Sequence, residues 1–213
     1  MRRVLSILLC VIIVCCTVSS GLADFVFRDG IEWYMSEEQV KSHLEKEAGS
    51  DQYVITDIDS SNFVSIFPQE ATNPQSWLLM VENISLGSDE ETVTLSLVGT
   101  KKTGLFVAFY TIEPKVSTDE YHYDRARDLL AQLEKKYGKF EKEDKWKRRK
   151  QIAQNKMVYE FSKDLKDKTI IYGYIIKMES GYELVIEYQS PRREEIEQSM
   201  QDGSFYIEPA FGL

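Results

Sequence analysis

The densest run of chemically active side chains is a basic segment, residues 145–150, which reads Lys145-Trp146-Lys147-Arg148-Arg149-Lys150. Five cations in six residues are unusual here because the whole chain is acidic, with a formal net charge of −9. Cations around a tryptophan could hold an acidic protein or an anionic polymer through charge and cation–π contact. The alternative is a solvated loop in which the tryptophan packs inside and the acidic residues of 141–144 oppose the charge. We treat the six residues as a candidate partner-binding site.

Candidates for catalysis or metal binding are few. All three cysteines lie within the first 23 residues, so the rest of the chain has no thiol nucleophile or thiolate ligand. His43 and His122 have no Glu-x-x-His or His-x-His partner, and we expect surface histidines. Residues 57–62 have oxygen spacing loosely like a calcium loop, but they lack its glycine and terminal glutamate, which favours a turn. No nucleophile-elbow, phosphate-loop or dinucleotide glycine pattern occurs, so we predict no catalytic, cofactor or metal site.

The N-terminus predicts export. Arg2 and Arg3 precede an apolar run over residues 4–18, and small residues over 19–23 lead to Asp24. A positive start, a short apolar core and a small-residue exit are typical of a secretory signal peptide. We expect cleavage before Asp24 and a protein that is secreted or held in the periplasm or cell envelope. The alternative is an uncleaved N-terminal anchor, since residues 4–23 approach the length that spans a bilayer. No later segment is long and apolar enough to span.

The charge composition limits which kinds of partner the protein can bind. Loss of Arg2 and Arg3 with the signal lowers the basic count from 26 to 24 against 35 acidic residues, a formal net charge of −11. Most of such a surface repels nucleic acid, so we expect no nucleic-acid partner. An apolar content of 43% predicts a packed core rather than disorder.

Two helices and a series of strands must position these residues. A capping box at Ser36–Gln39 opens a helix that ends at Gly49, and a second at Ser117–Glu120 opens a helix that ends at Gly138. A short helix is expected from Pro191 to Asp202. Residues 139–154 are polar and are expected to form a long loop or a frayed extension. Strand patterns occur at 24–28, 53–58, 63–67, 77–84, 92–98, 105–112, 156–161, 169–176 and 182–188.

This order predicts an α+β domain. Helices that interrupt antiparallel strands, without alternating one for one, favour a two-layer domain with a mostly antiparallel sheet packed against two main helices. We assign residues 1–23 to the signal peptide, 24–190 to the domain, and 191–213 to a C-terminal helix and tail packed on it. Each capped helix precedes a set of strands, so the order of elements is weakly repeated. The residues of the two halves do not match closely enough to form a sequence repeat.

Four tyrosines on paired strands could form a recognition surface. Alternation puts Tyr172 and Tyr174 on one face of their strand, and Tyr182 and Tyr188 on one face of theirs. Exposed aromatic side chains are enriched where proteins bind partners. A core role is favoured, because the apolar stripe of the second helix needs a sheet face to cover.

Two short segments of the sequence resemble segments of other proteins. Residues 27–40 contain Phe-Arg, Gly-Ile, Trp, Met-Ser and Gln-Val in the order that resembles the opening F-R-x-I-x-W-G-x-S of a group of uncharacterised exported bacterial proteins. Residues 129–138 and the later Trp146 are similar to that group's second helix, L-x-x-L-x-x-K-Y-G, and its following tryptophan. The chain departs at Tyr34 and Gln39, where the group has glycine and often glutamate. The element order is also loosely similar to outer-membrane assembly lipoprotein and β-lactamase inhibitor protein domains, which are non-catalytic binding modules.

The sequence therefore favours an exported, non-catalytic binding or accessory protein of the bacterial cell envelope. Its partner would be a protein or an anionic envelope polymer. Two alternatives stay open: a carrier of an apolar ligand between sheet and helices, and a carboxylate-dependent hydrolase.

Overall fold

The computed structural model describes residues 30–47, 54–57, 76–84, 86, 88, 90–115 and 118–201. In chain order their elements are α2 (Glu37–Glu47), β1 (Val54–Asp57), β2 (Ser76–Ile84), β3 (Glu91–Thr100), β4 (Gly104–Pro114), α3 (Asp119–Tyr137), β5 (Glu141–Asp144), the 3-10 helix η3 (Trp146–Gln151), β6 (Lys156–Asp164), β7 (Ile170–Lys177), β8 (Tyr182–Gln189) and α4 (Arg193–Gln201). The structure confirms an α+β fold with a short C-terminal helix.

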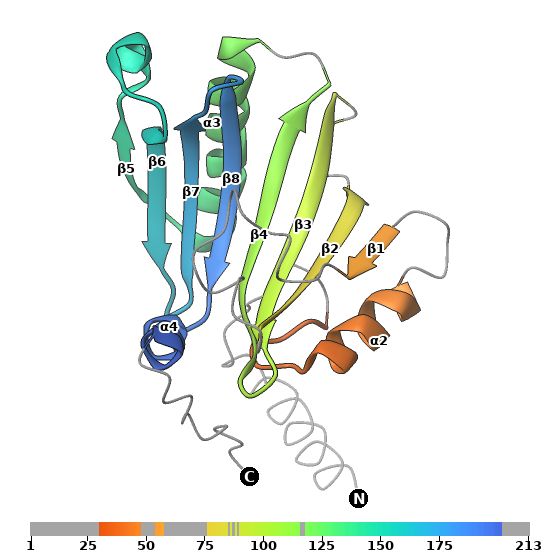
Figure 1. Ribbon diagram of the computed structural model, residues 1–213. Coiled ribbons are helices and arrows are strands. Elements are labelled where there is room, and N and C mark those ends of the chain that lie inside the picture. Colours follow the sequence, from red (N-terminus) through yellow and green to blue (C-terminus); the bar gives the residue numbers. More distant parts are fainter. Residues whose placement is uncertain are drawn as a thin grey trace, which may run out of the picture.

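The eight strands form one antiparallel sheet in the order β1-β2-β3-β4-β8-β7-β6-β5 (Figure 1). β4 is central, and its residues from Leu105 to Tyr110 are buried. The edge strand β5 has four residues, all charged and exposed. A short charged edge of this kind opposes pairing with another chain.

Among the described elements, one arrangement occurs twice: a helix followed by four strands. α2 is followed by β1–β4, α3 is followed by β5–β8, and the last strands of the two units pair with each other. Each unit also has an aromatic ring opposite a glycine: Trp77 pairs with Gly99, and Phe161 pairs with Gly173. A Cβ atom would lie 2.0 Å from the Trp77 ring at Gly99 and 2.1 Å from the Phe161 ring at Gly173, so neither position has room for a side chain. The weakly repeated order of elements in the sequence therefore corresponds to two structural units of similar organisation.

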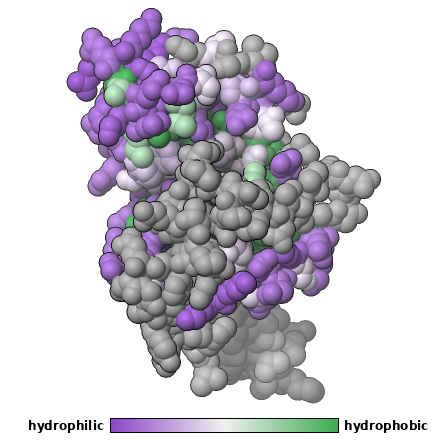
Figure 2. All heavy atoms as spheres, viewed as in Figure 1, coloured by the Kyte–Doolittle hydropathy of each residue, from purple (hydrophilic) through white to green (hydrophobic). Residues whose placement is uncertain are grey.

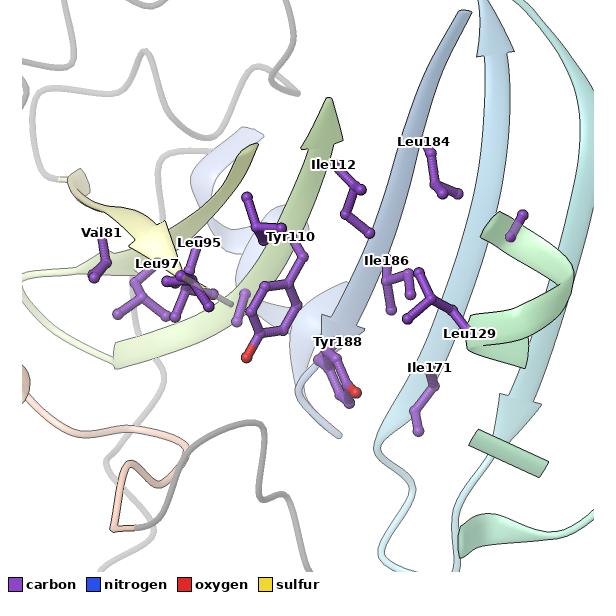
Figure 3. Packing of buried hydrophobic residues seen from close by; sticks show 14 of the residues in the cluster. Val81, Leu95, Leu97, Tyr110, Ile112, Leu129, Ile171, Leu184, Ile186 and Tyr188 are labelled. Atoms are coloured by element: carbon purple, nitrogen blue, oxygen red, sulfur yellow. The ribbon is translucent and has the colours of Figure 1, made fainter. Parts of the chain in front are cut away.

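The main core lies between one sheet face and the helices α2 and α3. Figure 3 shows Leu129 of α3 close to Ile171 of β7 and Ile186 of β8, and these side chains belong to one buried cluster with Val40 and Leu44 of α2. A second cluster lies on the opposite sheet face under α4. Its buried members are Leu78, Val98, Phe106, Val107, Phe109, Val185 and Ile196.

The helix starts follow the predicted chemistry with one shift. Ser36 Oγ accepts a bond from the Gln39 amide at 3.3 Å, and Gln39 Oε1 accepts one from the Ser36 amide at 2.8 Å, which confirms the first capping box. The cap of α3 is Thr118, whose side chain accepts from the Tyr121 amide. The second cap therefore lies one residue later than the predicted Ser117.

The prediction of a loop or frayed extension over 139–154 was wrong. Residues 141–144 form β5 along β6, and residues 146–151 form η3. Non-local contacts keep these residues in regular structure. β5 pairs with β6, and the Trp146 side chain at the start of η3 is buried.

Several predictions lie outside the described residues: the signal segment 1–23, the strands at 24–28 and 63–67, most of the calcium-like segment 57–62, and the tail after Gln201. Asp57 itself ends β1. In the described part of the chain, no helix has the length and apolar character needed to cross a membrane.

Candidate partner-binding surfaces

The basic segment is fixed to the domain by its tryptophan. Trp146 is 5% exposed and stacks on Tyr123 of α3, with ring centroids 5.1 Å apart and an interplanar angle of 6°. Tyr182 of β8 covers the indole from another side, at 5.0 Å between centroids. The Tyr123 hydroxyl donates to Asp144 at 2.5 Å, and this bond is the main cause that raises the pKa of Tyr123 to about 12. Trp146 is thus a packing residue and is not available to a partner.

Two of the five cations, Lys145 and Arg149, form ion pairs with other residues of the chain. The Arg149 guanidinium lies 4.6 Å from the centroid of the Trp146 ring, and its Nη2 lies 2.7 Å from Glu120 Oε1. Lys145 Nζ lies 2.8 Å from Glu143 Oε2 and 3.7 Å from Glu160 Oε1. The bond to Glu143 raises the pKa of Lys145, which keeps the ammonium charged.

The other three cations, Lys147, Arg148 and Lys150, are exposed. Within the described residues none of the three forms an ion pair. The backbone beneath them is held, because Lys177 Nζ donates to the Ile152 carbonyl at 2.7 Å and the Lys145 amide donates to the Val158 carbonyl at 2.9 Å. Figure 2 shows hydrophilic side chains gathered at the end of the molecule where Figure 1 places η3, between β5 and β6. The six-residue candidate site therefore reduces to three exposed cations on a fixed support.

A second polar surface lies on the sheet face opposite α3. We call it the tyrosine–glutamate strip; its members are Glu160, Tyr172, Tyr174, Glu183 and Glu187 on β6, β7 and β8. Register places Tyr174 opposite Glu160 and Val185, and Tyr172 opposite Glu187, so the side chains share one face. All five strip residues are partly exposed. The two tyrosine rings lie 5.3 Å apart.

The three glutamates of the strip differ in their partners. Glu160 accepts a hydrogen bond from the Tyr172 hydroxyl. Glu187 pairs with Arg193 of α4, which also pairs with Glu197. Glu183 Oε1 is shielded from solvent and accepts no hydrogen bond from the residues that the structure describes. Burial, with a smaller effect of the Glu113 charge, raises the pKa of Glu183. Burial likewise raises the pKa of Glu187, although Arg193 opposes this.

The core role predicted for the sheet tyrosines holds for three of the four, because Tyr182 and Tyr188 pack in the main core and Tyr174 packs against the second cluster. Tyr188 is 7% exposed within the main core, and Tyr182 packs against the same core beside Trp146. Tyr172 and Tyr174 lie on the other face and are half-buried. The reason is their strand: residues 170–177 turn Ile171, Gly173 and Ile175 toward α3 and the tyrosines away from it.

The histidines do not form a site. His122 is 3% exposed, so the prediction of a surface histidine was wrong there; its ring lies between Tyr121 and Tyr182. His43 is half-buried, and its ring lies against Gly30. Among the described residues, no group of three or more His, Cys, Asp or Glu side chains is placed to hold a metal ion.

Sequence reasoning did not single out the glutamates of the strip, although the pattern contained a signal. In β8, Glu183, Val185 and Glu187 alternate with Leu184 and Ile186. Period-two alternation places both glutamates on the face away from the main core, next to whatever β7 presents there. The missing information was the strand order, which brings β7 and β8 together.

Comparison with known proteins identifies no family. No protein-family model, no curated protein and no solved structure matches this chain. The resemblance of residues 27–40 and 129–146 to exported bacterial proteins stays a prediction, and function has to be argued from the surfaces described above.

Proposed function

We propose that this protein is an exported, non-catalytic binding or accessory protein of the bacterial cell envelope, and that its basic segment holds an anionic partner. The observation that carries the proposal is the exposure of Lys147, Arg148 and Lys150 above a buried Trp146. A support that is ordered before binding reduces the entropy lost when a partner docks.

Charge distribution supports a local site. The exported chain has a formal net charge of −11, so most of its surface repels an anion. Attraction is then confined to places where cations are not neutralised by neighbours. Such a cationic patch would orient an acidic protein or an anionic polymer as it approaches and favour one docking direction.

Capture from an envelope extract tests the binding site. The immobilised protein, as recovered after export, is compared with a variant in which Lys147, Arg148 and Lys150 are changed to serine. Lys145 and Arg149 stay unchanged because they form ion pairs with Glu143 and Glu120. The matched control changes three other exposed lysines to serine, namely Lys135, Lys139 and Lys166.

The proposal predicts an anionic partner that the unaltered protein and the control retain and the basic-segment variant loses. Equal capture by all three proteins, or equal loss in both variants, would show that the basic segment is only a solvated surface.

Export is tested separately by the mass of the chain recovered from outside the cytoplasm. The signal-peptide prediction requires a chain that begins at Asp24. A chain that retains Met1 and sediments with membranes would establish the N-terminal anchor instead.

A further inference from the structure

The basic segment presents its cations in a fixed geometric order. η3 is a 3-10 helix, in which three residues make one turn, so side chains three positions apart lie on the same side. The inward side shows this order, because the Arg149 guanidinium lies 4.6 Å from the centroid of the Trp146 ring. The exposed Lys147 and Lys150 share a second side, and one turn separates them by about 6 Å along the helix axis.

No acidic residue interrupts this part of the sequence. Residues 145–159 contain six lysines and arginines and no aspartate or glutamate, although the whole chain is acidic. Lys145 and Arg149 pair with acidic residues of other segments, and Lys156 at the start of β6 is exposed. An anionic chain that crosses η3 therefore meets attraction without repulsion from the segment itself.

An extended acidic polypeptide matches the spacing of the two lysines. Consecutive residues of an extended chain rise by about 3.3 Å and point to opposite sides, so alternate side chains share one side at intervals of about 6.6 Å. Alternate glutamates of such a chain face Lys147 and Lys150 together. Acidic segments with few apolar residues are disordered when free, so they are available in an extended form.

The exposed neighbours of the cations are amides. Gln151, Gln154 and Asn155 are exposed, whereas the large apolar side chains within 145–156 are buried or half-buried, namely Trp146 and Ile152. The core of an interface with a folded protein is rich in apolar and aromatic groups, which these residues do not expose. An amide both donates and accepts, so it matches the N–H and C=O groups of a peptide backbone. A phosphate polymer offers acceptors, which match only the donors of the amides.

The third side of η3 combines both kinds of group. Arg148 and Gln151 are three positions apart and exposed, so a guanidinium and an amide lie next to each other. We infer that the basic segment binds an extended acidic segment of a partner polypeptide, with alternate carboxylates on Lys147 and Lys150 and with Arg148 and Gln151 on a further carboxylate and the peptide backbone. This inference rests on the proposed function, because it names the partner of the same site.

A titration with defined anions tests this inference. The probe is a fluorescent peptide in which glutamate and serine alternate, and the matched peptide has the same composition with its glutamates in adjacent pairs. Inorganic polyphosphate of equal charge is the third ligand, measured by competition. Binding to the exported protein is followed by fluorescence anisotropy at low and at physiological salt. The variants are the triple serine variant of Lys147, Arg148 and Lys150, Gln151→Ala, and the control Gln198→Ala at an exposed position on α4.

The inference predicts that the alternating peptide binds about threefold or more tightly than the paired peptide, because only its glutamates share one side. Gln151→Ala should weaken the binding of the alternating peptide about two- to tenfold and leave polyphosphate unchanged, and Gln198→Ala should alter neither. Equal binding of the two peptides, equal weakening of both ligands by Gln151→Ala, or tighter binding of polyphosphate would overturn the inference. The proposed function would survive these three results if the triple serine variant loses all binding. Undiminished binding by the triple serine variant would overturn both.

Discussion

A buried ion pair joins the two units of the fold. Glu91 at the start of β3 and Arg125 of α3 have side chains that are 0% and 9% exposed. Glu91 accepts bonds from Arg125 Nε at 2.8 Å, from Arg125 Nη2 at 2.6 Å and from the Tyr121 hydroxyl at 2.7 Å. Burial and the bond to Glu91 raise the pKa of Tyr121 to about 12, so its hydroxyl stays a donor. The helix of the second unit is thereby bonded to a strand of the first.

Changing Glu91→Gln removes the charge and keeps the size. The Arg125 guanidinium then stays in a position that is 9% exposed without its main counter-charge. Breaking a buried pair in this way costs about 3–5 kcal/mol. Asp128 provides a matched control, because it contacts the same guanidinium at 2.6 Å while its own side chain is 58% exposed. Asp128→Asn should cost about 0–1 kcal/mol.

Urea unfolding followed by circular dichroism measures both changes. With a slope of about 1–3 kcal/mol per molar urea, Glu91→Gln should lower the midpoint by roughly 1–5 M at an unchanged slope. Asp128→Asn should leave the midpoint nearly unaltered. A loss below about 1 kcal/mol for Glu91→Gln, or equal losses for the two substitutions, would refute the role given to the buried pair.

Three further changes test the packing around the two surfaces. Trp146→Ala should lower the free energy of unfolding by about 3–5 kcal/mol, because a buried ring stacked on Tyr123 is lost; a change below about 1 kcal/mol in urea unfolding would mean that the basic segment is a solvated loop. Gly173→Ala should cost about 1–3 kcal/mol, because its Cβ would lie 2.1 Å from the Phe161 ring; in a Phe161→Leu background the same change should cost less, and an equal cost would contradict the steric cause. Glu183→Gln should raise the free energy of unfolding at pH 7 by about 1 kcal/mol. Because the pKa of Glu183 in the folded protein is raised above its ordinary value of 4.5, this gain in stability should vanish as the pH falls below that value. Thermal melts of both proteins from pH 4 to 7 measure the difference. A variant that is less stable than the unaltered protein at pH 7 would contradict the prediction.

Local signals in the sequence predicted the elements that local chemistry forms. The capping box at Ser36–Gln39 forms as predicted, and the strand patterns predicted at 92–98 and 105–112 correspond to β3 and β4. β5 and η3 could not be found in this way. Residues 141–144 are all charged, and they form a strand only because β6 pairs with them and Trp146 docks between Tyr123 and Tyr182.

The candidate sites depended more on tertiary contacts. Charge density located the basic segment, but only the structure separates Arg149, which pairs with Glu120, from the exposed Arg148. The burial of His122 was readable from spacing, since it lies four residues before the buried Ala126 on α3. The tyrosine–glutamate strip required the order β8-β7-β6, which juxtaposes residues that no short window of sequence contains.

The central claim is that an anionic partner binds at Lys147, Arg148 and Lys150. Its most direct test is a titration of fluorescent polyglutamate into the exported protein, the triple serine variant of these residues, and the Lys135, Lys139 and Lys166 control. The account predicts salt-sensitive binding that the basic-segment variant weakens about tenfold or more and the control leaves unchanged. Binding that is absent from the unaltered protein at low salt, or that both variants weaken equally, would contradict it.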